Sequence, residues 1–160
     1  MKILYLAMVD FPRRVANRVQ VMKMCEAFSR SSDVTLAATA LHMEPSDLWR
    51  YYGIQKPFAI DVLGEPRRKP KTLFALPSIL RCVRRNRPDI VLVRSEYVAW
   101  LVSFFCKSLV YEMHDFQLRF KRFYPRLIRH SKTTVVVSEG LKKRMAEEGL
   151  PTEEVMVSPN

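Results

Sequence analysis

Short apolar runs, separated by amphipathic segments, constrain the fold of this chain more than any other feature of its sequence. The runs have the length of strands, and unbroken Val, Ile and Leu runs are typical of parallel strands that are buried on both faces. Strands are expected over residues 3–9, 33–39, 58–63, 90–93, 109–112, 133–137 and 155–157. This alternation predicts a Rossmann-like, doubly wound α/β domain, with a mainly parallel sheet of about six to seven strands and helices on both faces.

The segments between these runs predict helices. Apolar residues recur at helical spacing over residues 15–30. A short helix is expected over residues 45–53, with Ser46 as its N-cap and Gly53 near its end. Further helices are expected over residues 73–85, 97–105, 116–129 (around Pro125) and from Ser138 to about Glu148, and residues 64–71 form a basic loop.

Composition indicates one folded domain with an anionic partner. The chain has 160 residues, of which 48% are hydrophobic, and we expect a single domain over residues 1–160. There are 27 Lys and Arg against 16 Asp and Glu, a formal net charge of +11. Such an excess favours nucleic acid, a phospholipid surface or a phosphate-bearing substrate as partner. The charge alone does not choose among these three.

The cysteines and the apolar stretches indicate a cytoplasmic protein. Cys25, Cys82 and Cys106 are odd in number, lie far apart and show no zinc-binding spacing, so we interpret them as reduced core residues. The first apolar run is too short for a signal peptide. The longest apolar stretch, residues 97–106, is about half as long as a membrane-spanning helix. We therefore expect no membrane span.

Polar residues follow four of the predicted strands. Because ligands bind at the carboxyl ends of parallel strands, these residues are the candidate substrate-binding groups. We expect them along one rim of the sheet. The candidates are Asp10, Arg13 and Asn17 after the first strand, Arg94, Ser95 and Glu96 after the fourth, His114 and Asp115 after the fifth, and Ser138 and Glu139 after the sixth.

Structural alternatives exist for these candidates. Asp10 could satisfy backbone amides in its own turn, and Ser138 could be a helix N-cap. Glu139 could interact with a helix dipole, and Arg94 could end a strand in solvent. His114 is the strongest catalytic candidate, because an imidazole at the mouth of a parallel strand can hydrogen-bond a sugar hydroxyl or a phosphate.

Several motifs that bind cofactors or activate nucleophiles are missing from the sequence. It has no GxGxxG and no GxxxxGK[ST], so neither a dinucleotide site nor a P-loop is indicated. GxSxG and HExxH are also absent. We expect no metal and no cofactor to be bound by this chain itself.

An ordered set of segments resembles a known family. Residues 11–28 (FPRRVANRVQVMKMCEAF) resemble the first loop and helix of retaining GT-B glycosyltransferases of family 4. The resemblance continues in residues 89–95 (DIVLVRS), 110–115 (VYEMHD) and 136–142 (VVSEGLK). Residues 157–160 (VSPN) resemble the start of the PNG(V/I)D turn, where such enzymes cross to their second domain. Each segment is weak alone, and their common order makes the resemblance specific.

The resemblance implies the N-terminal half of a GT-B fold and the acceptor side of a glycosyltransferase. In enzymes of this family, the loop that corresponds to Asp10–Asn17 borders the acceptor, so the resemblance implies the same for this loop. It also implies that His114 faces the transferred sugar and helps to hold the donor. Arg94, Ser95 and Glu96 would lie along the acceptor pocket. The acceptor would be a glycan, a lipid-linked sugar or a small molecule, as in polysaccharide biosynthesis.

The resemblance also implies a nucleotide-sugar donor, which the family binds mainly through its C-terminal domain. That domain is missing from residues 1–160, so we expect little or no activity from this chain alone, because transfer needs both reactants positioned in one cleft. Its partner would be the C-terminal donor-binding domain or a separate subunit that supplies it. An alternative is that the chain is a non-catalytic subunit beside a donor-binding chain.

Basic and aromatic residues alternate over residues 116–129. Arg119, Lys121, Arg122 and Phe123 are candidates for binding an anionic membrane face, which would make the protein peripheral at the inner side of the membrane. A solvated helix whose aromatic residues pack on the sheet explains the pattern equally well. A nucleic-acid-binding module is the least favoured alternative, because no RRM, KH or helix-turn-helix signature is visible.

Overall fold

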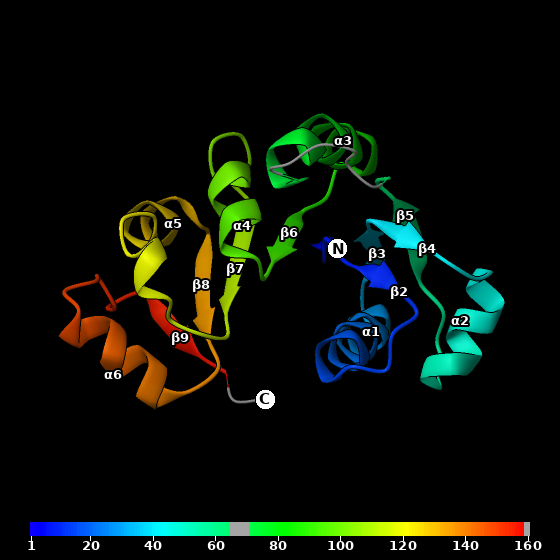
Figure 1. Ribbon diagram of the computed structural model, residues 1–160, viewed down its shortest axis with the longest axis horizontal. Coiled ribbons are helices and arrows are strands. Elements are labelled where there is room, and N and C mark those ends of the chain that lie inside the picture. Colours follow the sequence, from blue (N-terminus) through cyan, green and yellow to red (C-terminus); the bar gives the residue numbers. More distant parts are fainter. Residues whose placement is uncertain (65–70, 159–160) are drawn as a thin grey trace. The chain divides into compact units, whose positions relative to one another are not determined.

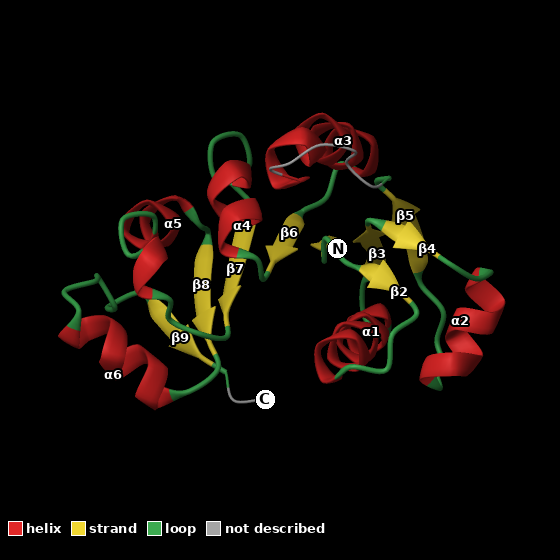
Figure 2. Cartoon of the chain, viewed as in Figure 1, coloured by secondary structure: helices red, strands yellow, loops and turns green. Residues whose placement is uncertain are grey.

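The chain folds as two compact units, Met1–Asp89 and Ile90–Asn160. The computed structural model describes residues 1–64 and 71–158, and of residues 71–74 only the backbone. The expected basic loop over residues 64–71 and the last two residues of the VSPN segment therefore lie mainly outside the described residues. Figure 1 shows the elements of each unit in chain order, and Figure 2 distinguishes their helices from their strands.

The first unit is built on three parallel strands. They are β1 (Lys2–Leu6), β3 (Asp33–Ala38) and β5 (Ala59–Val62), in the order β5-β3-β1. Leu4 pairs with Thr35, and Leu36 pairs with Ile60. The helices of this unit are α1 (Ala16–Ser29), α2 (Pro45–Tyr52) and α3 (Lys71–Asn86). Two short parallel strands, β2 (Asp10–Phe11) and β4 (Ala40–Leu41), form a second sheet that the sequence analysis did not predict.

The second unit contains four parallel strands. They are β6 (Ile90–Val93), β7 (Leu109–Met113), β8 (Thr133–Val136) and β9 (Val155–Val157), in this order. Val93 pairs with Tyr111, and Met113 pairs with Val136. Three α-helices and one 3₁₀-helix alternate with them: α4 (Glu96–Val102), η1 (Leu118–Phe120), α5 (Tyr124–His130) and α6 (Glu139–Glu147).

The predicted Rossmann-like α/β class is confirmed. Seven parallel strands alternate with helices, and the apolar runs form the centre of each unit as expected for strands that are covered on both faces. Leu4, Tyr5 and Leu6 of β1 are fully buried, as are Leu109 and Tyr111 of β7. The three cysteines are buried free thiols. None of the described helices is long and apolar enough to cross a membrane.

Some helix ends differ from the prediction. Glu44, and not Ser46, is the N-cap of α2, because Pro45 takes the first helical position, where its missing N–H costs nothing. The helix expected over residues 97–105 ends at Val102. The helix expected over residues 116–129 is divided into η1 and α5, since Pro125 is best tolerated in a first turn. Gly53 ends α2 in the left-handed conformation, at φ 60°, as predicted.

A buried carboxylate joins α1 to the turn after α2. Glu26 is buried on α1, where its Oε1 accepts hydrogen bonds from the backbone amides of Gln55 and Lys56. Its Oε2 lies 3.0 Å from Nζ of Lys23, which also donates to the carbonyl of Gly53 at 2.6 Å. The Gln55 amide lowers the pKa of Glu26 most, and together with Lys23 and Lys56 it outweighs the opposing effect of burial.

This carboxylate predicts how stability changes with pH. Glu26→Ala leaves two backbone amides without their acceptor and should lower the free energy of unfolding by about 2 kcal/mol at neutral pH. Because the folded-state pKa is lowered, the contribution is present above the usual pKa of a glutamate and is lost as pH falls below it. Urea unfolding of wild type and variant at several pH values measures this.

The control for this experiment is Glu153→Ala, which removes an equal charge from an exposed position. It should change stability little at any pH. A deficit of Glu26→Ala that stayed constant down to about pH 3 would contradict the proposed contribution of the ionised carboxylate.

Candidate functional site

Three neighbouring parallel strands of the second unit bring polar residues to one edge. Strand β6 pairs with β7, and β7 pairs with β8. Arg94, His114 and Ser138 follow the carboxyl ends of these strands within two residues. The edge is therefore the one where ligands bind in sheets of this kind.

Arg94, His114 and Glu112 form one hydrogen-bonded set at this edge. Nη2 of Arg94 lies 2.8 Å from Nδ1 of His114, and Nε2 of His114 lies 2.6 Å from Oε1 of Glu112. Nε of Arg94 is 3.9 Å from the other carboxylate oxygen, Oε2. The imidazole therefore lies between a cation and an anion, in contact with both. The structure brings together two predicted residues, Arg94 and His114, and adds Glu112.

This set determines which nitrogen of His114 carries the proton. A guanidinium can only donate hydrogen bonds, so Nδ1 must accept from Arg94. The proton of the neutral ring is then on Nε2, which donates it to Glu112. Both ring nitrogens are thus engaged, and a ligand can hydrogen-bond the ring only by replacing one of these two partners.

Glu112 was not recognised as a site residue in the sequence. It was interpreted as the end of its strand, but β7 continues to Met113 and the Glu112 side chain is only 7% exposed. A carboxylate in a buried strand requires a partner, because its desolvation would otherwise cost several kcal/mol. An acidic residue inside an apolar run, two positions before a histidine, was the signal that could have identified it, since alternate residues of a strand share one face.

Glu96 lies in a similar but less paired environment. It begins α4 after Ser95, whose side chain makes no capping bond to the helix. Burial raises the pKa of Glu96, and the negative charge of Asp115 adds to this, while a hydrogen bond from its own backbone amide and the charges of Arg119 and His114 oppose it. A carboxyl group with a raised pKa near a histidine is typical of sites that exchange protons or bind hydroxyl groups.

The hydrogen bonds of Ser138 and Asp115 are to nearby backbone amides. Ser138 is the N-cap of α6 and accepts a hydrogen bond from the amide of Leu141 at 3.2 Å, so its structural interpretation is confirmed. Glu139 is exposed in the first turn of the same helix. Asp115 is exposed, and its carboxylate accepts a bond from the amide of Phe116 at 2.8 Å.

Asp10, in the first unit, has cationic neighbours. Its carboxylate lies 2.8 Å from Arg13, 3.3 Å from Arg18 and 3.9 Å from His42. Asn17 is exposed and accepts a hydrogen bond from Arg18. Arg18 is the partner that the sequence analysis missed, since it was regarded only as part of the helix.

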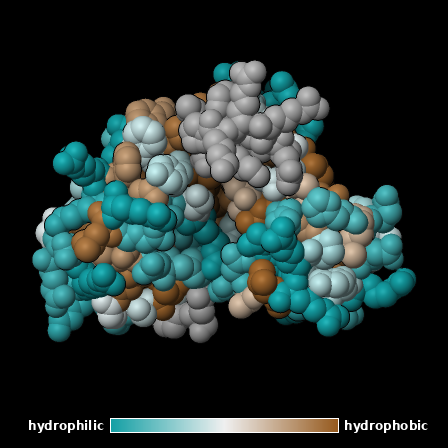
Figure 3. Space-filling view, in the orientation of Figure 1, coloured by the Kyte–Doolittle hydropathy of each residue, from teal (hydrophilic) through white to brown (hydrophobic). Residues whose placement is uncertain are grey.

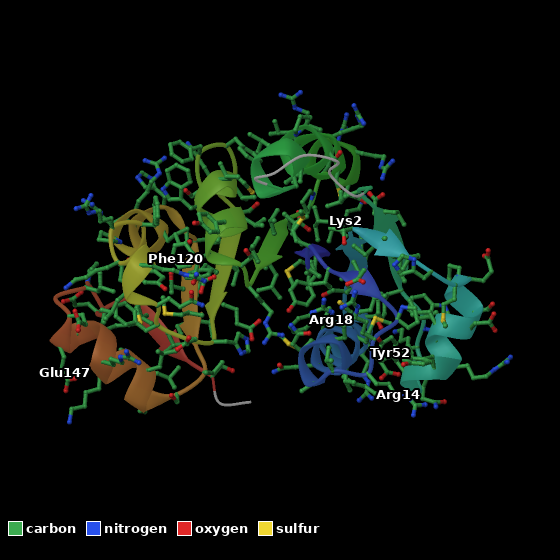
Figure 4. All side chains as sticks on the ribbon, viewed as in Figure 1. Lys2, Arg14, Arg18, Tyr52, Phe120 and Glu147 are labelled. Atoms are coloured by element: carbon green, nitrogen blue, oxygen red, sulfur yellow. The ribbon has the colours of Figure 1, made fainter. Side chains whose placement is uncertain are left out.

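The loop between β2 and α1, which contains Arg13 and Arg14, is held by contacts with α2. The hydroxyl of Tyr52 accepts a hydrogen bond from the amide of Arg13 and donates one to its carbonyl, both at 2.8 Å. Arg14 lies over the ring of Tyr51, 5.1 Å from its centroid. Figure 4 labels Arg14, Arg18 and Tyr52, which come from the loop, from α1 and from α2.

The pKa of Asp10 reports the balance of these contacts. Burial would raise it, but a hydrogen bond from its own backbone amide and those from Arg18 and Arg13 outweigh burial and hold the pKa below its usual value. The bond to its own amide supports the structural interpretation of Asp10, and Arg13 and Arg18 pair with its charge. That Asp10 shares a rim with Arg94, His114 and Glu139 stays a prediction.

The sequence matches one established family over most of its length. The profile of Glycosyltransferase Family 4 matches residues 18–160. The chain belongs to Glycosyltransferase Family 4. No curated protein sequence matches it significantly. The match begins at Arg18 and includes Arg94, Glu112 and His114, so the hydrogen-bonded set belongs to the part that this family shares.

Solved structures with the same fold are about twice as long as this family member. The Anabaena protein Alr3699/HepE in complex with UDP and glucose superposes with a TM-score of 0.69 and 16% identity, covering 100% of this chain and 44% of that chain. The lipopolysaccharide outer core galactosyltransferase WaaB superposes with a TM-score of 0.66 and 13% identity, covering 100% of this chain and 46% of that chain. The UDP-N-acetylglucosamine 2-epimerase of Rickettsia bellii superposes with a TM-score of 0.65 and 16% identity, covering 100% of this chain and 45% of that chain. These likenesses show the fold, as the N-terminal half of GT-B proteins.

The hydrogen-bonded set predicts a measurable tautomer. Long-range ¹H–¹⁵N correlation spectra at pH 8 should show the Nε2–H form of His114, because Arg94 occupies Nδ1 as a donor. Glu112→Gln should keep this form, since its amide oxygen can still accept from Nε2. Glu112→Ala should also keep it, because Arg94 still donates to Nδ1. An Nδ1–H tautomer in the wild type would contradict the geometry.

Proposed function

We propose that this family member is the acceptor-side, N-terminal domain of a GT-B glycosyltransferase that uses a nucleotide-sugar donor and retains the anomeric configuration. The observation that carries the proposal is the match to Glycosyltransferase Family 4 over residues 18–160. It is supported by the set of Arg94, Glu112 and His114 at the carboxyl ends of β6 and β7.

The donor would be bound mainly by a second domain. The chain spans less than half the length of the GT-B proteins that it resembles, one of which was solved with UDP and glucose. None of the phosphate-binding motifs sought in the sequence is present. We infer that nucleotide and diphosphate are bound elsewhere, on a domain of the same protein or on a separate subunit, and that this chain alone transfers sugar slowly or not at all.

Within this function, His114 would bind a hydroxyl of the transferred sugar. The hydroxyl can reach the ring by replacing Arg94 at Nδ1 or Glu112 at Nε2. Glu112 is the more buried partner, with 7% of its side chain exposed against 16% for Arg94, and its bond to the ring is the shorter one. We therefore assign the replacement to Arg94, which would turn to an anionic group of the ligand.

Glu112 would then act as a positioning residue. Its bond to Nε2 fixes the ring and leaves Nδ1 as an acceptor for the hydroxyl proton of the sugar. Glu96, with its raised pKa, and Asp115 would contribute further hydrogen bonds to the acceptor. Asp10, Arg13 and Asn17, in the first unit, would be further acceptor-binding residues.

The test supplies a donor-binding domain. The chain is combined with a donor-binding GT-B domain, fused or as a second chain, and nucleotide release from a nucleotide sugar is measured with candidate acceptors. The combination should transfer sugar, and His114→Ala should lower kcat by about 100-fold, because a hydrogen bond to the reacting sugar is lost in the transition state.

His130→Ala is the control, because His130 is exposed at the end of α5 and has no place in the proposed site. It should leave kcat unchanged. An undiminished rate in His114→Ala would contradict the role of His114. Micromolar binding of the nucleotide to residues 1–160 alone, measured by calorimetry, would contradict the acceptor-side assignment.

A further inference from the structure

The second unit exposes apolar side chains next to cations. Tyr97 is 51% exposed, Phe104 55% and Leu118 58%. Arg119 and Arg122 are exposed beside them in the chain. We call these five residues the basic aromatic surface. Figure 3 shows apolar residues among hydrophilic ones at the upper left, where Figure 1 draws α4.

One cluster of aromatic rings makes this surface continuous. The ring of Tyr97 lies 4.6 Å from that of Phe120, and Phe120 lies 6.1 Å from Phe123. Trp100 lies 5.1 Å from Phe123 and 4.9 Å from Phe104. Helix α4 and the segment from η1 to α5 therefore form one side of the unit, with Phe120, labelled in Figure 4, buried beneath it.

The segment that contains η1 and α5 carries charge of one sign. Residues 116–138 contain six Lys and Arg and no Asp or Glu. Lys121 is one of these six, and its Nζ lies 2.8 Å from the carboxylate of Glu148. Among the residues that the structure describes, the other five basic side chains form no ion pair. Arg122 is exposed, so its charge is available to an anionic partner.

The ring geometry favours a lipid surface over a nucleic acid. Single-stranded nucleic acids bind proteins by stacking bases on free ring faces. Here Tyr97 meets Phe120 at 85° and Trp100 meets Phe104 at 86°, so the rings meet edge to face. Arg126 lies over Phe104 at 3.7 Å and Arg119 over Phe120 at 4.8 Å. Ring edges, an aliphatic Leu118 and flanking cations suit the bilayer interface.

We propose that the basic aromatic surface binds peripherally to an anionic lipid bilayer. Arg119 and Arg122 contact lipid phosphates, and Tyr97, Phe104 and Leu118 enter the headgroup region. Of the membrane candidates from the sequence, Lys121 is neutralised by Glu148 and Phe123 supports the cluster from below. The proposal does not depend on sugar transfer, so it can fail or hold independently of the proposed function.

Vesicle binding tests the proposal. The full chain is sedimented with phosphatidylcholine vesicles and with vesicles in which roughly a third of the lipid is phosphatidylglycerol. Binding should require phosphatidylglycerol and should weaken with salt. Arg122→Glu should weaken it by at least about tenfold, since it reverses one charge at the surface. Leu118→Ser should weaken it about fivefold through lost apolar contact.

Two control variants make the same changes elsewhere. Arg84→Glu changes the net charge equally at an exposed position of α3, where Arg81 is also exposed and Arg85 forms an ion pair with Asp61. Met156→Ser removes an apolar side chain that is 60% exposed on β9. Both should bind vesicles within about threefold of wild type. Equal losses in Arg84→Glu and Arg122→Glu would overturn the proposal, because net charge alone would then explain binding.

Fluorescence gives an independent readout. Trp49 and Trp100 are the two tryptophans, so Trp49→Phe leaves Trp100, within the ring cluster, as the reporter. Its emission should shift to shorter wavelength with phosphatidylglycerol vesicles. An unchanged spectrum, stronger binding to single-stranded RNA than to vesicles, or self-association through this surface in sedimentation velocity would each overturn the proposal.

Discussion

A buried carboxylate on a central strand determines the arrangement of the candidate site. Glu112 is desolvated inside β7, and the ring of His114 provides its hydrogen bond at 2.6 Å. Arg94, from the neighbouring strand, supplies the positive charge at the other side of the ring. Because β6 and β7 are parallel and in register, residues that follow the two strands meet, and no flexible loop is needed to bring them together.

The same physical requirement appears at two other acidic residues. Glu26 is buried on α1 and is satisfied by backbone amides and a lysine, and Asp10 is satisfied by its own amide and two arginines. In both cases these bonds lower the pKa in spite of burial. Glu96 has fewer such bonds, and its pKa is raised. Burial outweighs the favourable contacts of Glu96, whereas the donors around Glu26 and Asp10 outweigh burial.

The fold could be predicted in most respects, whereas only part of the candidate site could. Seven apolar runs indicated seven strands, because a strand covered on both faces leaves a signal in its own residues. The division of residues 116–130 into η1 and α5 and the small sheet of β2 and β4 depend on short segments, whose local preferences are weak. Arg94 and His114 were identified from their positions after strands. Glu112 and Arg18 were missed, because each was interpreted only as part of a strand or a helix, and their pairing with His114 and Asp10 depends on where the side chains lie.

The sequence by itself determined the alternation of strands and helices, the excess of positive charge and the family, because periodicity, composition and ordered motifs are properties of the chain. The tertiary structure decided which polar groups are paired. It joined His114 to Glu112 and Arg94, left Glu96 less paired, and placed Ser138 as a helix cap. It also showed that Tyr97 and Phe104 contact the segment from η1 to α5. The contacts between α4 and the segment from η1 to α5 form only when separate segments pack, so no single segment could reveal them.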